Sequence, residues 1–227
     1  MSNELIPDVA LMDNTEQRTP LVLVLDSSGS MQGEAIAQLN EGLRLLEREL
    51  KKDPIASKRV RLLTIEYGGQ DEAHSSARWV DAMDFVAPTL EAGGSTPTGR
   101  AVDLALAEVE AEKQRFKQAG ISYTRPWMFL MSDGKPTDAW QAAAERCRQA
   151  EQANKVAVFP VAVGSAAHRD ALGAFSSNGP EAVKVLHGLR FKELFLWLSV
   201  SMKTVSQSTP GGQVQLPAVD TWTSAPV

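Results

Sequence analysis

Asp26, Ser28 and Ser30 form a cluster of oxygen-bearing side chains at every second position, with Gly29 between the two serines. They directly follow Leu21–Leu25, an apolar run without polar alternation, which is typical of a strand buried on both faces of a parallel sheet. Open α/β sheets place their ligand sites at the carboxyl ends of such strands. Hard oxygen donors without sulfur or imidazole favour a hard divalent ion, most naturally Mg²⁺. Loops of this composition also serve as ordinary turns and helix caps, so both interpretations stand on this stretch alone.

Two further polar loops repeat this arrangement. Residues 92–99 are rich in glycine, carry Thr96 and precede a helix expected over roughly 99–119. Asp133 and Gly134 follow the apolar strand expected at 127–131. Because the carboxyl ends of parallel strands meet at one edge of a sheet, we expect the three loops to converge there. This convergence favours the metal-site interpretation.

The three loops together resemble the metal-ion-dependent adhesion site of von Willebrand factor A (VWA) domains, and the resemblance covers residues 20–205. The motifs are Asp26-Ser27-Ser28-Gly29-Ser30, Gly94-Ser95-Thr96-Pro97-Thr98-Gly99 and Ser132-Asp133-Gly134. The resemblance implies that Ser28, Ser30 and Thr96 offer hydroxyl oxygens to Mg²⁺, while Asp26 and Asp133 hold it directly or through water. It also implies a coordination position left for an acidic side chain of another protein. Ser132 stands where many members have threonine, at a position that is not a ligand in the family.

Manganese is the alternative ion, and Ca²⁺ suits a hydroxyl-rich octahedral site less well because it is larger.

Within this family, residues 125–140 and 191–199 and the single-domain length resemble the bacterial tellurium-resistance (TerY-like) branch. That resemblance implies a cytoplasmic protein that acts in a stress-response or defence system, sometimes beside a protein kinase and a phosphatase. Serine and threonine residues in 201–209 and 221–224 are then candidate substrates of a partner kinase.

The expected elements alternate along the chain. Strands are expected near 21–25, 60–67, 78–85, 127–131, 156–163 and 182–186, and helices near 33–53, 99–119, 139–153, 167–176 and 190–204. This alternation predicts an α/β fold with a doubly wound, mostly parallel sheet, one antiparallel edge strand and helices on both faces. The connection 68–77 is too short for a parallel crossover, so 60–67 and 78–85 are expected to form a hairpin.

Two features of the segment 138–153 carry local predictions. Asp138 with Gln141 resembles a capping box that opens the helix expected at 139–153. Cys147 shares an apolar face of that helix with Trp140, Ala143 and Ala150. It is therefore expected to be a core residue with an inert thiol.

The chain of 227 residues is expected to hold one domain at 20–205, after a lead-in at 1–19 and before a flexible tail at 206–227. For the tail, disorder and docking through Leu216-Pro217 or Trp222 are both open. A net charge of −5 disfavours nucleic acid as a partner, and no apolar run approaches the ~20 residues that cross a membrane. The start lacks the pattern of a signal peptide, and the single cysteine fits a reducing compartment. A cytoplasmic location is therefore expected.

A divalent-metal-dependent protein-interaction module without enzymatic activity is the primary hypothesis. A metal-dependent phosphohydrolase or nucleotide-binding enzyme is the alternative. Against the enzyme, His74, His168 and His187 accompany no Gly-x-Ser-x-Gly nucleophile motif, and residues 93–96 lack the Gly-Lys-Ser/Thr ending of a P-loop. Arg100 and Lys135 are the basic residues nearest the three loops, and they are more simply read as solvated flanks.

Overall fold

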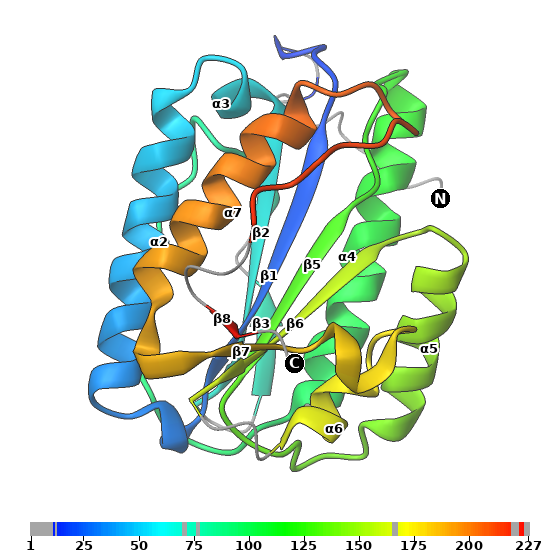
Figure 1. The fold of residues 1–227 in the computed structure, drawn as a ribbon. Coiled ribbons are helices and arrows are strands. Elements are labelled where there is room, and N and C mark those ends of the chain that lie inside the picture. The colour runs from blue at the N-terminus through cyan, green and yellow to red at the C-terminus, as the bar shows by residue number, and fades with distance from the viewer. Residues whose placement is uncertain are drawn as a thin grey trace, which may run out of the picture.

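A mostly parallel sheet forms the centre of the molecule (Figure 1). The computed structural model describes residue 11 and residues 13–69, 72–75, 78–164, 168–218 and 223–224. Strand order is β3-β2-β1-β5-β6-β7-β8, with β4 also paired to β2. The strands are β1 (Thr19–Ser27), β2 (Val60–Gly68), β3 (Glu72–Ser75), β4 (Val80–Asp81), β5 (Trp127–Ser132), β6 (Ala157–Val163), β7 (Lys184–Leu186) and β8 (Thr223–Ser224). Strands β2, β1, β5, β6 and β7 run parallel to one another, which confirms the predicted α/β class.

Helices cover both faces of the sheet (Figure 1). The helices α2 (Glu34–Lys52) and α7 (Phe191–Ser206) lie over one face, and α4 (Thr98–Ala119) and α5 (Gln141–Gln152) lie over the other. Short helices complete the fold: α3 (Ala56–Arg59), α6 (Arg169–Gly173), η1 (Gly29–Met31), η3 (Gly179–Ala182) and η4 (His187–Leu189). No helix in the described part of the chain is both long enough and apolar enough to cross a bilayer.

Strand β1 is buried on both faces, as its continuous apolar run predicts. Leu21, Leu23 and Leu25 pack in one core cluster with side chains of α2 and α7. Val22 and Val24 point the other way and pack with side chains of α4 and α5, as the period-2 alternation of a strand requires. Asp26 therefore stands at the end of the central strand, between two hydrophobic layers.

The local sequence of α2 determines which face of this helix is buried and where the helix ends. Leu39, Leu43, Leu46 and Leu50 are buried along one face, which their alternating three- and four-residue spacing predicts. Asp53 ends the helix, and its carboxylate accepts the N–H groups of residues 55 and 56. Helix α7 packs closely against α2.

The edge hairpin differs from the prediction. The strand that turns back onto β2 is β3, inside the segment expected to be a loop, with Gly68 paired to Glu72. From the predicted strand 78–85, only Val80–Asp81 forms a strand, and it pairs with β2 at Leu62 and Arg61. Gly69 adopts φ +58°, a conformation open to glycine, so the chain reverses within a few residues instead of using the full connection. A second antiparallel pair, β8 against β7, lies at the opposite edge.

The segment after α7 lies against its own domain. Val214 and Leu216 pack against the core cluster shared by α2 and α7. The indole N–H of Trp197 donates to the carbonyl oxygen of Pro217 at 2.9 Å. Of the two predicted anchors, Leu216-Pro217 therefore docks, whereas Trp222 lies outside the described residues. Before β1, Leu11 packs against Phe116 and Ile121.

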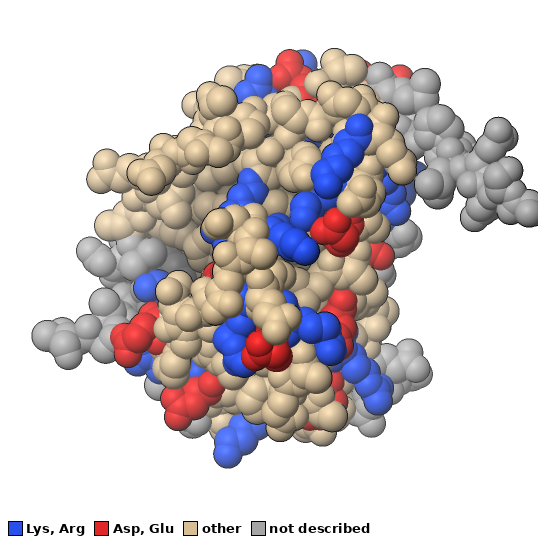
Figure 2. All heavy atoms as spheres, turned by 90° about the vertical axis from the view of Figure 1, so that its right-hand side faces the viewer, with Lys and Arg blue, Asp and Glu red and all other residues tan. Residues whose placement is uncertain are grey.

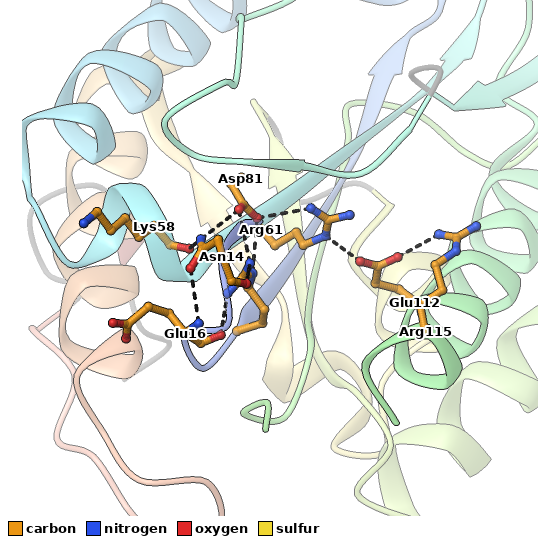
Figure 3. A network of polar contacts seen from close by, with 8 residues as sticks. Asn14, Glu16, Lys58, Arg61, Asp81, Glu112 and Arg115 are labelled. Carbon is orange, nitrogen blue, oxygen red and sulfur yellow. Dashed lines mark hydrogen bonds and ion pairs between the residues drawn. The ribbon is translucent and has the colours of Figure 1, made fainter. Parts of the chain in front are cut away.

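A buried ion network joins the amino ends of β1 and β2 to α4 (Figure 3). The side chains of Arg18, Arg61, Asp81 and Glu112 are all at most 3% exposed. Asp81 lies 3.3 Å from Arg18 Nε and 3.1 Å from Arg61 Nη1. Arg61 also pairs with Glu112, so two buried guanidinium groups face two buried carboxylates. Burial lowers the pKa of Arg18, and the charge of Asp81 opposes that effect.

Candidate metal centre

The predicted ligands gather at the carboxyl ends of β1 and β5, the lower edge of the sheet in Figure 1. These strands are direct neighbours, with Leu25 opposite Met131. Asp26 is the second-last residue of β1. Ser28 directly precedes η1, and Ser30 lies within it. Asp133 comes directly after β5, and Thr96 stands two residues before α4. The sheet thus brings together loops that are about 40 to 110 residues apart in the sequence.

Side-chain oxygens of the loops after β1 and β5 lie within contact distance, and Thr96 borders the same space. Ser28 Oγ is 3.1 Å from Ser30 Oγ, and the Ser30 hydroxyl donates to Asp133 Oδ1 at 2.6 Å. A Cβ added to Gly134 would stand 3.7 Å from both Ser30 Oγ and Thr96 Oγ1. The two hydroxyls therefore border the same small space beside Gly134. All five predicted ligands lie at this edge.

Asp26 is held from both sides in a buried position. Its Oδ1 accepts the N–H of Ser28 at 2.8 Å, and its Oδ2 accepts the hydroxyl of Ser132 at 2.5 Å. Burial raises the pKa of the Asp26 carboxyl, and the nearby charge of Asp133 adds to the increase, while the hydrogen bonds from Ser132 and Ser28 oppose it. Ser132 also accepts the N–H of Gly134 at 3.2 Å. Ser132 is therefore a positioning residue that links Asp26 to the Asp133 loop.

Glycine backbones bring the Thr96 loop against the end of β1. Gly29 donates its N–H to the carbonyl of Gly94 at 3.1 Å, and Gly93 donates to the carbonyl of Ser27 at 2.8 Å. Gly94 adopts φ +68°, and a Cβ there would stand 1.8 Å from the carbonyl oxygen of Gly69. This position accepts only glycine without a backbone shift, and it fixes where the following Thr96 stands.

Thr137 and Asp138, which the sequence did not assign to the site, join the Thr96 loop to the Asp133 loop. Thr137 Oγ1 accepts the N–H of Thr96 at 2.9 Å, and its own N–H donates to the Thr96 carbonyl at 2.9 Å. The Asp138 carboxylate accepts the N–H groups of Gly99 at 3.1 Å and Arg100 at 2.9 Å. Asp138 therefore caps α4, and the predicted capping box of α5 is wrong. Helix α5 instead begins after Trp140, without a side-chain cap.

Tyr67 anchors the end of β5 beside the site. It lies in β2, is fully buried, and donates its hydroxyl to the carbonyl of Met131 at 2.7 Å. Burial raises the pKa of this phenol well above its ordinary value, and the charge of Asp26 adds to the shift. The neutral phenol thus fixes the end of β5 directly before Ser132 and Asp133.

The donor set fits a hard divalent cation. Two carboxylates and three hydroxyls supply oxygen, which is the donor type that Mg²⁺ and Mn²⁺ take in proteins. In the described part of the chain, no group of three or more His, Cys, Asp or Glu side chains is placed to hold a metal. The candidate centre therefore depends on its serine and threonine hydroxyls.

The other sequence candidates lie elsewhere or are inert. His74 lies on the edge strand β3, 3.5 Å from Glu66 and 61% exposed. His168 precedes α6 and His187 begins η4, both distant in sequence from the three loops. Cys147 is completely buried in the core cluster of α4 and α5, and burial raises its pKa to about 12. This confirms its prediction as a core residue.

A family model for the von Willebrand factor type A domain matches residues 21–191, a span that contains all three loops. The chain belongs to this family. No curated protein sequence matches this VWA chain.

Solved structures share the VWA fold at low identity. The pilus adhesin SpaC from Lactobacillus rhamnosus GG is 14% identical with a TM-score of 0.65, over 84% of this chain and 32% of the adhesin. The vWF domain of the type V pili tip protein Mfa5 from Porphyromonas gingivalis is 12% identical with a TM-score of 0.61, over 88% of this chain and 99% of that domain. Proximal thread matrix protein 1 from the mussel byssus, in a structure with a zinc-occupied MIDAS motif, is 14% identical with a TM-score of 0.51, over 84% and 49%. The VWA chain thus spans less than half the length of the SpaC and byssus proteins.

Proposed function

We propose that this VWA domain is a divalent-metal-dependent protein-interaction module rather than an enzyme. The ion would be held by Asp26, Ser28, Ser30, Thr96 and Asp133. The observation that carries this proposal is the meeting of the loops, with Ser30 Oγ 3.1 Å from Ser28 Oγ and 2.6 Å from Asp133 Oδ1. The zinc-occupied MIDAS motif of the byssus matrix protein and the adhesin function of SpaC support it by analogy of fold.

The neutral ligands explain how such a site would bind another protein. Three of the five proposed ligands are hydroxyls, so they neutralise less of the charge of the ion than an all-carboxylate cage would. When bound, Mg²⁺ supplies an electrophilic position for an Asp or Glu carboxylate of the partner. The chain's own contribution is to hold the hydroxyls in place, through the Ser132–Asp26 contact and the Thr137–Thr96 pair. We propose Mg²⁺ as the ion, with Mn²⁺ as the alternative.

We further propose that the protein works in a bacterial stress-response or tellurium-resistance system in the cytoplasm. The likeness of residues 125–140 and 191–199 to the TerY-like branch supports this role. A protein kinase and a phosphatase are the partners that this branch suggests. The buried, unpaired state of Cys147 is compatible with a reducing compartment.

The first experiment is thermal unfolding in EDTA and in rising Mg²⁺. At ten times its dissociation constant, Mg²⁺ should stabilise the wild-type domain by about 1.4 kcal/mol. Asp133→Asn keeps the shape of the side chain but weakens the proposed site, so this shift should disappear. Asp103→Asn removes an exposed carboxylate on α4 and is the matched control, which should keep the full response. An equal response in Asp133→Asn and wild type would place the ion elsewhere and contradict the proposal.

Partner binding is tested with a peptide that carries one central glutamate, measured by calorimetry with and without Mg²⁺. Binding should need the ion and should disappear in Asp133→Asn and in a peptide with glutamine in place of glutamate. Peptide binding that survives EDTA would show that the acidic residue is not a metal ligand.

A further inference from the structure

A hollow of about 810 Å³ lies at the opposite end of the sheet from the metal centre. It is bordered by the last turns of α4, the amino ends of β5 and β6, and residues 208–214 after α7. Its volume is in the range of small-molecule sites. None of the five proposed metal ligands lines it. It is therefore a separate feature of the domain.

The charged side chains that line this hollow are all basic. They are Lys113, Lys117, Arg125 and Lys155, and no described Asp or Glu is among the lining residues. Lys117 and Lys155 are exposed and form no ion pair with the described residues, whereas Lys113 pairs with Glu110 at 2.9 Å. Figure 2 shows Lys and Arg side chains, with an acidic side chain beside some of them, in the upper half of the face that lies to the right in Figure 1. In a chain of net charge −5, such a local excess of positive charge favours an anion.

Arg125 is held in place at the start of β5. Its Nη2 donates to the carbonyl oxygens of Glu151 at 2.8 Å and Val156 at 2.5 Å. Its Nε is buried and has no hydrogen-bond partner among the described residues. A guanidinium fixed by two carbonyl groups loses little conformational entropy when an anion binds.

An aromatic wall borders the basic side chains. Trp127 and Phe159 both line the hollow, and their ring centroids are 4.4 Å apart. Phe159 also stacks on Phe129 at 5.0 Å with an interplanar angle of 13°. Trp127 and Phe129 are buried, but Phe159 is only half-buried. Phe159 therefore keeps part of its surface accessible from the hollow, where a flat apolar group of a ligand can pack against it.

We propose that this hollow binds a small organic phosphate that carries a flat ring, a ligand of the nucleoside-monophosphate class. The phosphate would lie among Arg125, Lys117 and Lys155, because no described Asp or Glu lines the hollow beside them and several cations suit a multiply charged anion. The ring would lie against Phe159. Neutral side chains on the border, among them Thr124, Asn154 and Gln213, can donate to or accept from hydroxyl groups between these two ends.

The probe is AMP, titrated into the full chain by calorimetry in EDTA and low salt, so that no metal takes part. In Lys117→Glu/Lys155→Glu, both changes are at exposed positions, and AMP affinity should fall at least about tenfold, or about 1.4 kcal/mol. Lys58→Glu changes an exposed lysine of α3 outside the hollow and is the matched control. It should leave the affinity within about twofold of wild type.

The role of the ring is tested by comparing AMP with ribose 5-phosphate, which has the same phosphate but no base. The wild type should bind AMP at least about tenfold tighter, since stacking of a base on an aromatic side chain contributes about 1–3 kcal/mol. In Phe159→Leu this preference should fall toward onefold, while the affinity for ribose 5-phosphate stays near its wild-type value.

Four results of the titrations with AMP and ribose 5-phosphate would overturn the proposal. They are no AMP binding at millimolar concentration, equal losses in the double variant and Lys58→Glu, equal wild-type affinity for AMP and ribose 5-phosphate, and loss of AMP binding in Asp133→Asn. The last result would assign AMP to the metal centre. Tighter binding of a glutamate-rich decapeptide than of AMP would assign the hollow to a protein segment and would also reject a small-molecule site.

Discussion

Asp81→Asn tests how much the buried ion network contributes to stability (Figure 3). The Asp81 carboxylate lies 3.3 Å from Arg18 Nε and 3.1 Å from Arg61 Nη1, and it accepts from Asn14 Nδ2 at 3.0 Å. The substitution removes a buried negative charge and replaces one acceptor oxygen with an N–H donor that faces other donors. It leaves two buried guanidinium groups with one buried carboxylate, Glu112.

Removing one partner of a buried ion pair costs about 3–5 kcal/mol, because an uncompensated charge stays buried. That is a large part of the ~5–15 kcal/mol that separates a typical folded domain from its unfolded state. With an unfolding entropy of about 2.1 cal/mol/K per residue, a chain of 227 residues should lose about 6–10 °C in Tm.

The assay is urea unfolding followed by circular dichroism, where a lower midpoint with an unchanged m value reports lost stability. Asp103→Asn makes the same chemical change in an exposed pair with Arg146, at 2.6 Å. Exposed pairs contribute little, so its midpoint should stay within experimental error of wild type. If Asp81→Asn also stays there, the buried network contributes no more than a surface pair and the reasoning is refuted.

Three further outcomes follow from buried groups and from the glycine loop. Burial raises the pKa of Glu151, but hydrogen bonds outweigh that effect and lower the pKa below the ordinary 4.5. Glu151→Gln should therefore reduce the free energy of unfolding at pH 7 by about 1–3 kcal/mol. Urea unfolding across pH should show this difference shrink as the pH falls through the lowered pKa. Cys147, with its pKa raised to about 12 by burial, should resist iodoacetamide at pH 8 in the native state and react fully in urea; rapid native labelling would contradict its burial. Gly94→Ala should lower the Tm more than Gly120→Ala and should weaken the Mg²⁺ response. Both glycines have positive φ, but only a Cβ at Gly94 would meet a backbone carbonyl, at 1.8 Å. Equal Tm changes would show that this close approach is not needed.

Much of the frame could be predicted from the sequence because its signals are local. The apolar run at 21–25 and the period of the α2 leucines each report burial through the spacing of neighbouring residues. The carboxyl ends of parallel strands lie at one edge of a sheet, which places the residues after β1 and β5 at the same edge. The expectation that Asp26, Thr96 and Asp133 converge needs no more than this topology, and the structure brings them to one edge.

The sequence could not predict contacts whose partners are far apart along the chain. Asp138 precedes α5 and has the residue pattern of its cap, but its carboxylate accepts the N–H groups that open α4, 38 and 39 residues earlier. Nothing local distinguishes these two helix ends, since both offer unpaired N–H groups.

Tertiary structure likewise decides which charged side chains are buried and which strands pair at the edge of the sheet. Arg18, Arg61, Asp81 and Glu112 are types that are mostly exposed, and only their mutual placement 20 to 63 residues apart makes their burial tolerable. The expected antiparallel pairing of 60–67 with 78–85 is present only at Val80–Asp81, because β3 occupies the rest of that edge of β2 directly after the turn that begins at Gly68 and Gly69. The sequence by itself determined the central strand and the oxygen-bearing side chains that follow it. Only the folded chain decided which distant groups hold those side chains in place, because hydrogen bonds and ion pairs depend on distance in space and leave no periodic pattern along the chain.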